Sequence, residues 1–199
     1  MKGVLGPAAI VLVALAASAG AASAPRCERQ AGETVFTDRQ LRVFERVSGT
    51  GDETTLRVLA CIPRTRGARL LERRDNNLDE TSRVVSAARA GRFPVVEYTV
   101  EGGASIDQQL VEYGARSATR LARIEVNDDG SPATYVVTRG GGIALLAGGR
   151  VTGFDEAGRR VLATGATGLA AAGNRVYWTA SGAAASAVLK NHPHGDLAG

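Results

Sequence analysis

Arginines in short turns are the residues of this sequence whose type and spacing best suit binding chemistry. They occur in or just after turns that interrupt runs of alternating apolar and polar residues. A guanidinium donates a planar fork of hydrogen bonds to carboxylates and phosphates, so such turns gathered on one rim would bind an anionic partner. The alternative is a solvated surface without a ligand. The arginines of this predicted binding surface are Arg64, Arg66, Arg116, Arg159 and Arg160.

Aromatic residues recur at matching positions of the predicted strands. Tyr98, Tyr135, Tyr177 and Trp178 show this recurrence, which favours packing in the core or between repeats. The alternative assigns Tyr177 and Trp178 to the binding surface, where flat amphipathic rings would stack on a glycan or peptide.

Asp75, Asn77 and Asp79 occupy positions one, three and five of a calcium-loop pattern. The pattern then fails, because Glu80 stands where the loop needs glycine and Ser86 stands where it needs glutamate. We therefore predict a polar loop, with these three residues as weak metal candidates, and we expect no metal and no cofactor.

We assign no catalytic residue. The two histidines, His192 and His194, lie near the C-terminus, where we expect a frayed end, so we expect no Ser-His-Asp or Cys-His system. Acids such as Glu97, Asp107 and Glu112 lie in predicted strands. We expect them to face solvent beside arginines, and a carboxylate pair of a hydrolase is the alternative.

Cys27 and Cys61 are the two cysteines of the chain. An even number of cysteines in an exported protein predicts a disulfide, which by chain entropy would stabilise the fold by roughly 3–4 kcal/mol. A redox pair or an intermolecular bridge is the alternative. Arg26, directly before Cys27, argues against a lipidation site.

The N-terminus has the order of a secretory signal peptide. Lys2 precedes an apolar run over residues 4–17, and small residues follow. The run is shorter than the roughly 20 apolar residues of a spanning helix. We predict a signal-peptide helix over residues 1–24, cleaved within 19–24, and a secreted or extracytoplasmic protein with no membrane span after cleavage.

The rest of the chain shows the period-two pattern of strands, with turns that carry glycine. The strands fall into groups that repeat about every forty residues, the length of a four-stranded propeller blade. The fourth group lacks a last strand, which residues 34–37 could supply in a closed ring. The predicted groups are 41–47, 56–62 and 69–72; 83–88, 93–100, 106–113 and 118–126; 133–139, 143–146, 150–155 and 159–164; and 169–172, 175–180 and 186–190.

Three segments carry a resemblance to a known group. Residues 58–61, 149–162 and 171–179 resemble secreted actinobacterial proteins of uncharacterised function that have β-propeller-like repeats, loosely like TolB-type propellers. The resemblance implies a fold and a compartment and does not imply a chemistry.

Composition narrows the choice of function. The chain has 24 basic and 20 acidic residues and a net charge of +4, which is too small and too evenly spread to predict nucleic-acid binding.

We predict an all-β domain of about four propeller-like antiparallel meanders over residues 25–190, with a flexible tail over 191–199. A β-sandwich or an irregular meander is the alternative fold. The predicted function is non-enzymatic binding or scaffolding for a protein or an anionic cell-envelope polymer, and an extracytoplasmic hydrolase using carboxylates or a metal is the alternative.

Overall fold

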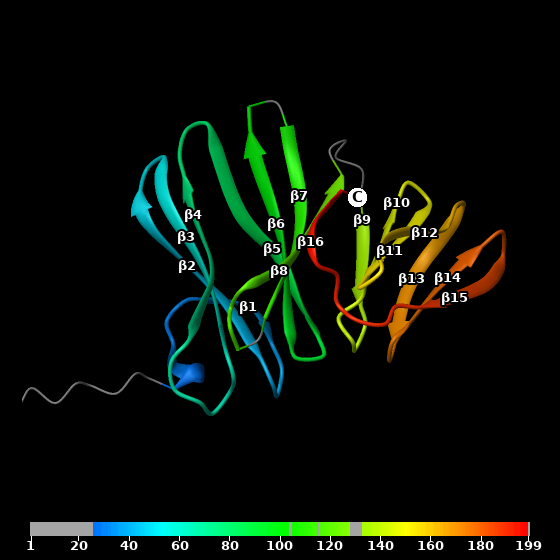
Figure 1. Cartoon of the computed structure of the whole chain (residues 1–199). Coiled ribbons are helices and arrows are strands. Elements are labelled where there is room, and N and C mark those ends of the chain that lie inside the picture. Colours follow the sequence, from blue (N-terminus) through cyan, green and yellow to red (C-terminus); the bar gives the residue numbers. More distant parts are fainter. Residues whose placement is uncertain (1–25, 104, 115, 128–132, 199) are drawn as a thin grey trace, which may run out of the picture.

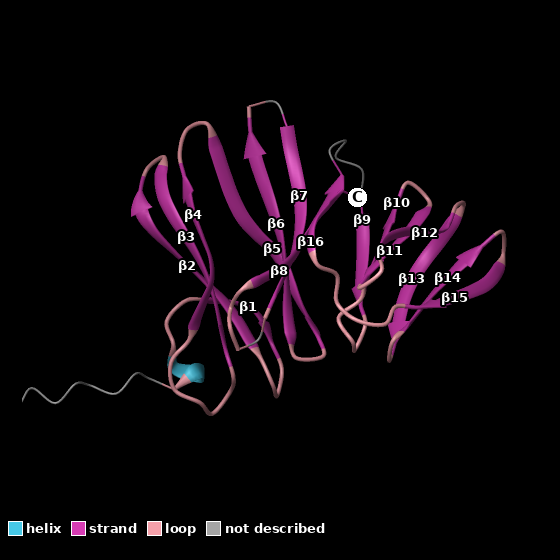
Figure 2. Ribbon diagram, viewed as in Figure 1, coloured by secondary structure: helices cyan, strands magenta, loops and turns pink. Residues whose placement is uncertain are grey.

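The fold is all-β, with strands arranged in four sheets (Figures 1 and 2). The computed structural model describes residues 26–103, 105–114, 116–127 and 133–198. The predicted signal peptide lies outside the described residues. A 3-10 helix, η1 (Cys27–Arg29), precedes the first strand.

Each sheet is a meander of consecutive antiparallel strands. The first sheet holds β1 (Glu33–Thr37), β2 (Arg42–Thr50), β3 (Glu53–Cys61) and β4 (Arg69–Asn76); the second holds β5 (Glu80–Ala90), β6 (Phe93–Gly102), β7 (Ser105–Tyr113) and β8 (Arg120–Asn127), joined by β16 (Gly195–Ala198). The third sheet holds β9 (Ala133–Val137), β10 (Ile143–Ala147), β11 (Arg150–Asp155) and β12 (Gly158–Ala163); the fourth holds β13 (Ala166–Ala172), β14 (Arg175–Ala180) and β15 (Ala183–Val188). The four predicted strand groups are therefore confirmed, although several strands are longer than expected.

The sheets form a row that follows the order of the sequence (Figure 1). The first strands of successive meanders contact one another: β1 contacts β5, β5 contacts β9, and β9 contacts β13. Separate hydrophobic clusters fill the spaces between neighbouring sheets. The second and third sheets are therefore covered on both faces. Four stacked sheets differ from the two layers of a β-sandwich.

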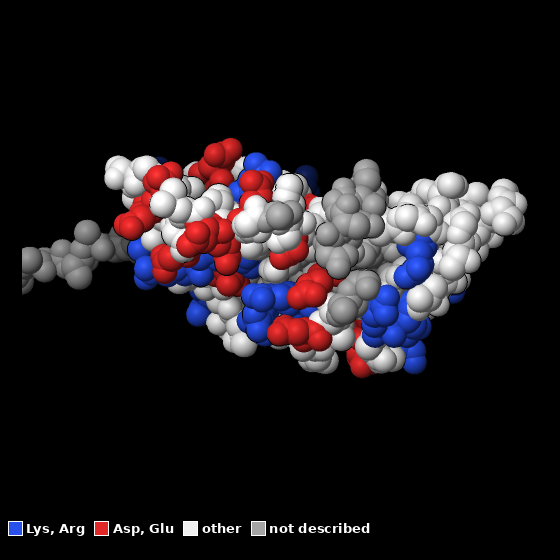
Figure 3. All heavy atoms as spheres, turned by 90° about the horizontal axis from the view of Figure 1, so that it is seen from above, with Lys and Arg blue, Asp and Glu red and all other residues white. Residues whose placement is uncertain are grey.

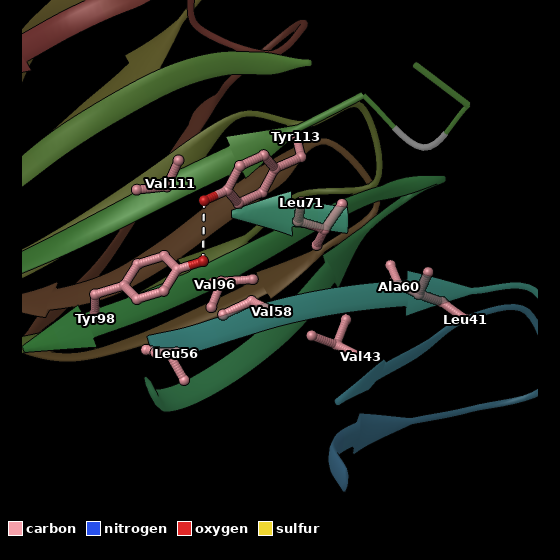
Figure 4. Packing of buried hydrophobic residues seen from close by; sticks show 10 residues of the cluster. All are labelled: Leu41, Val43, Leu56, Val58, Ala60, Leu71, Val96, Tyr98, Val111 and Tyr113. Carbon is pink, nitrogen blue, oxygen red and sulfur yellow. Dashed lines mark hydrogen bonds between the residues drawn. The ribbon is translucent and has the colours of Figure 1, made fainter. Parts of the chain in front are cut away.

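The space between the first and second sheets also holds a polar network. The hydroxyl groups of Tyr98 and Tyr113 lie 2.9 Å apart within the apolar cluster (Figure 4). Tyr113 also donates a hydrogen bond to the Glu72 carboxylate at 2.6 Å. The guanidinium of Arg74 lies 4.2 Å from the centre of the Tyr98 ring. Burial raises the pKa of both tyrosines. Tyr98 thus acts as a packing residue.

The strand over residues 34–37, which could have completed the fourth group in a closed ring, does not lie at that edge. Residues 34–37 belong to β1, which pairs with β2 and not with the fourth sheet. Asp38 closes this hairpin, because its Oδ1 accepts hydrogen bonds from the backbone N–H groups of Gln40 and Leu41 at 2.7 and 2.8 Å. A local turn therefore determines the partner of β1. The fourth sheet has three strands among the described residues, as the strand pattern predicts.

The segment predicted as a flexible tail returns to the second sheet. Gly195–Ala198 forms β16, which pairs in parallel with β8 and supplies a partner for the backbone groups at that edge. The His192 ring packs against Phe93, with ring centres 4.9 Å apart, and Pro193 is buried. Side-chain packing and strand pairing together hold this segment.

Candidate anion-binding cleft

Alternate turns of a meander lie at the same end of its strands, and this end of the first two sheets carries arginines. The turns β1–β2, β3–β4, β5–β6 and β7–β8 lie together here, at the lower end in Figure 1. They surround a cleft of about 900 Å³. We call it the arginine cleft, and its arginines are Arg39, Arg66, Arg69, Arg89, Arg92 and Arg116.

The arginines of the cleft differ in whether the protein already engages them. Arg89 pairs with the Asp38 carboxylate, and Arg92 lies over the Phe93 ring, 5.2 Å from its centre. Partial burial opposes ionisation of Asp38, but hydrogen bonds from the backbone of Gln40 and from Arg89 outweigh it and lower the pKa. Within the described ranges, no side-chain hydrogen bond or ion pair engages the other four guanidiniums: Arg39, Arg66, Arg69 and Arg116.

The floor of the arginine cleft is apolar. Leu41 and Ala60 are buried there, and Ile62 leaves 48% of its surface exposed. Among the described residues that line the cleft there is no carboxylate and no histidine. The cleft therefore offers apolar contact surrounded by positive charge.

The β3–β4 turn, which carries two of the predicted arginines, is held by the N-terminal segment. Cys27 and Cys61 form a disulfide with an S–S distance of 2.03 Å, which confirms the predicted pairing. The backbone N–H of Cys27 donates to the carbonyl of Thr65 at 2.9 Å. Arg64 has a positive φ of 70°, a conformation that non-glycine residues rarely adopt. This turn is fixed by contacts distant in sequence.

A second hollow continues the basic surface. It has a volume of about 590 Å³, is lined by Arg39, Pro63 and Arg64, and shares Arg39 with the arginine cleft. Three of the predicted residues, Arg64, Arg66 and Arg116, therefore lie around two adjoining hollows.

The other predicted members of the binding surface lie elsewhere. Arg160 belongs to β12 in the third sheet and pairs with Asp155 at 2.8 Å, and Arg159 precedes it on the same strand. Tyr177 and Trp178 are neighbours on β14 and so point to opposite faces of the fourth sheet. Tyr177 is 42% exposed, whereas Trp178 is 8% exposed in the core between the third and fourth sheets. The structure therefore does not bring all seven residues onto one surface.

Sequence reasoning missed several arginines of the cleft. Arg39 and Arg92 lie in turns at the same end of the strands, while Arg69 and Arg89 lie in the strands beside such turns. Counting alternate turns along the predicted meanders would have grouped them with Arg66. The pairing of Arg89 with Asp38 has no sequence signal, because it joins residues of different sheets.

The weak metal candidates make hydrogen bonds at the end of β4 and in the turn that follows it. Asp75, in β4, accepts a hydrogen bond at Oδ1 from the Thr55 hydroxyl at 2.8 Å and forms an ion pair with Arg73 at 3.1 Å. Asn77 Oδ1 accepts from the backbone N–H groups of Asp79 and Glu80 at 2.8 and 2.9 Å. Across the part of the chain that the structure describes, no group of three or more His, Cys, Asp or Glu side chains could hold a metal ion. The contacts thus favour the polar loop.

Two strand acids predicted to face solvent are buried. Glu112 is fully buried, and Glu97 is 7% exposed. The Glu97 carboxylate accepts hydrogen bonds from Ser86 and Gln108, whereas neither Glu112 oxygen has a hydrogen-bond partner among the described residues. Burial raises the pKa of Glu112 to about 8. The prediction fails because the second sheet is covered on both faces, so a charged position on it need not reach water.

Comparison with known proteins gives no match: no family model, curated protein or solved structure matches the chain. The resemblance to secreted proteins with propeller-like repeats therefore stays a prediction.

Proposed function

We propose that the chain is a secreted, non-enzymatic binding module of propeller-like meanders. Its arginine cleft takes an anionic group of a partner protein or cell-envelope polymer. The observation that carries this proposal is the presence of four guanidiniums without a side-chain partner, among the described residues, around one cleft.

The charge arrangement supports an anionic ligand. Guanidiniums close together repel one another, and an anion in the cleft would relieve this repulsion. Each would also donate hydrogen bonds to carboxylate or phosphate oxygens, and such charged hydrogen bonds contribute roughly 1.5–3 kcal/mol. The apolar floor adds contact area for the body of the ligand.

The placement of the acids favours binding over hydrolysis. A hydrolase that uses carboxylates needs them beside the scissile bond of the substrate. Glu97 and Glu112 are buried between sheets, and the described lining of the arginine cleft has no carboxylate.

Secretion forms part of the proposal on two grounds. The disulfide between Cys27 and Cys61 is typical of proteins outside the reducing cytoplasm. The order of residues in the N-terminal segment is that of a signal peptide. In addition, no helix in the described ranges is long and apolar enough to cross a membrane.

Calorimetric titration of the purified, oxidised protein tests the function. The probes are sodium polyphosphate and poly-L-glutamate, which separate phosphate from carboxylate ligands. We expect at least one to bind, with an affinity that falls as salt rises. R66A and R116A should each weaken binding about tenfold or more, as expected from the loss of a charged hydrogen bond.

The matched control is R150A, because Arg150 is an exposed arginine at the start of β11, outside the cleft. This variant should bind as tightly as the wild type. Failure of both probes to bind, or equal losses in R66A and R150A, would overturn the proposal.

A further inference from the structure

The loop between β4 and β5 presents an apolar side chain to solvent between polar residues. Leu78 at its tip is 83% exposed, the highest value among the exposed large hydrophobic residues described. Asp79 and Glu80 follow it and are also exposed. We call residues 77–80 the Leu78 loop.

The Leu78 loop is already fixed in one conformation. The Asn77 side chain accepts hydrogen bonds from the N–H groups of Asp79 and Glu80, and the Asn77 N–H donates to the Glu80 carbonyl at 2.9 Å. A preformed loop loses little conformational entropy on binding. This rigidity makes it suitable as a ligand for another surface.

The Leu78 loop and the arginine cleft lie at opposite ends of the strands. The cleft is at the end formed by the β1–β2 and β3–β4 turns, whereas the loop joins β4 to β5 at the other end (Figure 1). Seen from above, this second end shows acidic side chains over the first two sheets (Figure 3). Exposed acids in its turns include Asp52, Glu53, Asp79 and Glu80.

The two surfaces complement each other in chemistry. The arginine cleft has an apolar floor that includes Leu41 and Ile62, surrounded by unpaired guanidiniums. The Leu78 loop carries one exposed leucine next to two carboxylates. Leucine on the apolar floor and carboxylates on the arginines would satisfy both parts of the cleft at once.

We propose that the Leu78 loop of a second copy of this chain occupies the arginine cleft. This inference rests on the proposed function, since it names the partner of the same anion-binding cleft. Because the two surfaces are at opposite ends of one chain, each copy uses its loop on one neighbour and its cleft on another. Such a head-to-tail contact builds a ring if it closes and a filament if it does not.

The experiment uses one variant with a reversed cleft charge and one with a neutral loop, studied by sedimentation velocity at low salt. The cleft variant carries R66E and R69E, and the loop variant carries D79S and E80S. The wild type should form species that grow with concentration and dissociate as salt is raised or polyphosphate is added. Each variant alone should be a monomer.

A mixture of the two variants gives the sharpest prediction. The cleft variant still has an intact loop, and the loop variant still has an intact cleft, so together they can form one contact. The mixture should therefore contain a one-to-one heterodimer and nothing larger. L78S, a milder change at an exposed position, should also weaken self-association of the wild type.

The matched control is D52S with E53S where β2 turns into β3, which removes two acids at the same end without changing the Leu78 loop. It should associate like the wild type. A wild type that stays monomeric while polyphosphate or polyglutamate binds the cleft would overturn this inference and leave the proposed function standing. Absence of both self-association and probe binding would overturn both. Association that the control abolishes, or a mixture without heterodimer, would overturn the inference.

Discussion

The backbone N–H of Arg64 donates a hydrogen bond to the Glu28 carboxylate, with 2.6 Å between nitrogen and oxygen. Glu28 lies in η1, beside the disulfide, and Arg64 lies in the turn that borders the arginine cleft. The N-terminal segment therefore positions a turn that belongs to the proposed binding site. The hydrogen bond from the Arg64 backbone also contributes to lowering the pKa of Glu28, after a larger contribution from the backbone N–H of Glu28 itself.

Replacing Glu28 should weaken binding more than it weakens the fold. E28A removes the acceptor of the Arg64 N–H, so the β3–β4 turn should lose its fixed position. We expect several-fold weaker polyanion binding with little change in the urea midpoint. E28Q keeps an acceptor oxygen, so its affinity for the polyanion should lie between those of E28A and the wild type. Equal affinity of all three proteins in calorimetry would contradict this role.

Acid should reproduce the effect of E28A. Because the pKa of Glu28 is lowered in the folded protein, its stabilising contribution is present at neutral pH and disappears as the pH falls through that lowered pKa. Affinity for polyphosphate should therefore decrease at low pH in the wild type. The corresponding decrease should be smaller in E28A, and an identical pH profile would count against the hydrogen bond.

Reducing the disulfide should affect stability and binding together. Cys61 lines the arginine cleft and is bonded to Cys27 across a sequence separation of 34. Loss of the bond should lower the free energy of unfolding by roughly 3–4 kcal/mol in the chain-entropy model. We expect the double variant C27S/C61S to show this loss in urea unfolding and to bind polyphosphate more weakly. If C27S/C61S binds polyphosphate as tightly as the wild type, the N-terminal segment does not position the cleft.

The strand groups could be predicted because local features determine them. Alternation of apolar residues and glycine-containing turns define hairpins such as β11 and β12, which closely match the predicted ranges 150–155 and 159–164. The disulfide followed from the even number of cysteines. None of these inferences requires knowledge of which sheets lie next to each other.

The features that the sequence did not indicate depend on contacts between sheets. Glu112 is buried because a neighbouring sheet covers its face. The short sequence of β16 has little strand pattern of its own, and its pairing depends on the open edge of β8. Similarly, Arg66 and Arg116 meet at one cleft because the first two sheets are adjacent. Counting alternate turns along a meander predicts at which end of the strands each turn lies. It does not predict that the turns of two different sheets meet.

The buried carboxyl group of Glu112 should make the protein less stable as the pH rises. Its pKa is about 8 in the folded protein, against 4.5 for an ordinary glutamate. Between these values the unfolded chain has released the proton that the folded protein keeps, so the free energy of unfolding falls with rising pH and levels off above about 8. E112Q lacks this titration. Its stability relative to the wild type should increase across this interval by a few kcal/mol.

Urea unfolding at a series of pH values measures this difference. The two proteins should be most similar near pH 4.5, where Glu112 is protonated in the folded protein and about half protonated in the unfolded chain. E101Q is a suitable control, because Glu101 pairs with Arg83 at a partly exposed position. A constant difference between E112Q and the wild type at all pH values would contradict the assignment of the titration to Glu112.

Asp155 should contribute more to stability than its ion-pair partner Arg160. The Asp155 side chain is 2% exposed, and besides two hydrogen bonds from Arg160 it accepts the backbone N–H groups of Ala157 and Lys190 at 3.1 and 3.2 Å. D155A would leave these partly buried donors without their acceptor, at a cost of roughly 2 kcal/mol. R160A leaves the aspartate with its backbone partners, so we expect a loss of about 1 kcal/mol. Urea unfolding compares the free energies of unfolding of the two variants and the wild type. Hydrogen exchange at the Lys190 amide should accelerate mainly in D155A. Equal losses in the two variants would mean that the ion pair, rather than the backbone contacts, holds the segment that leads to β16.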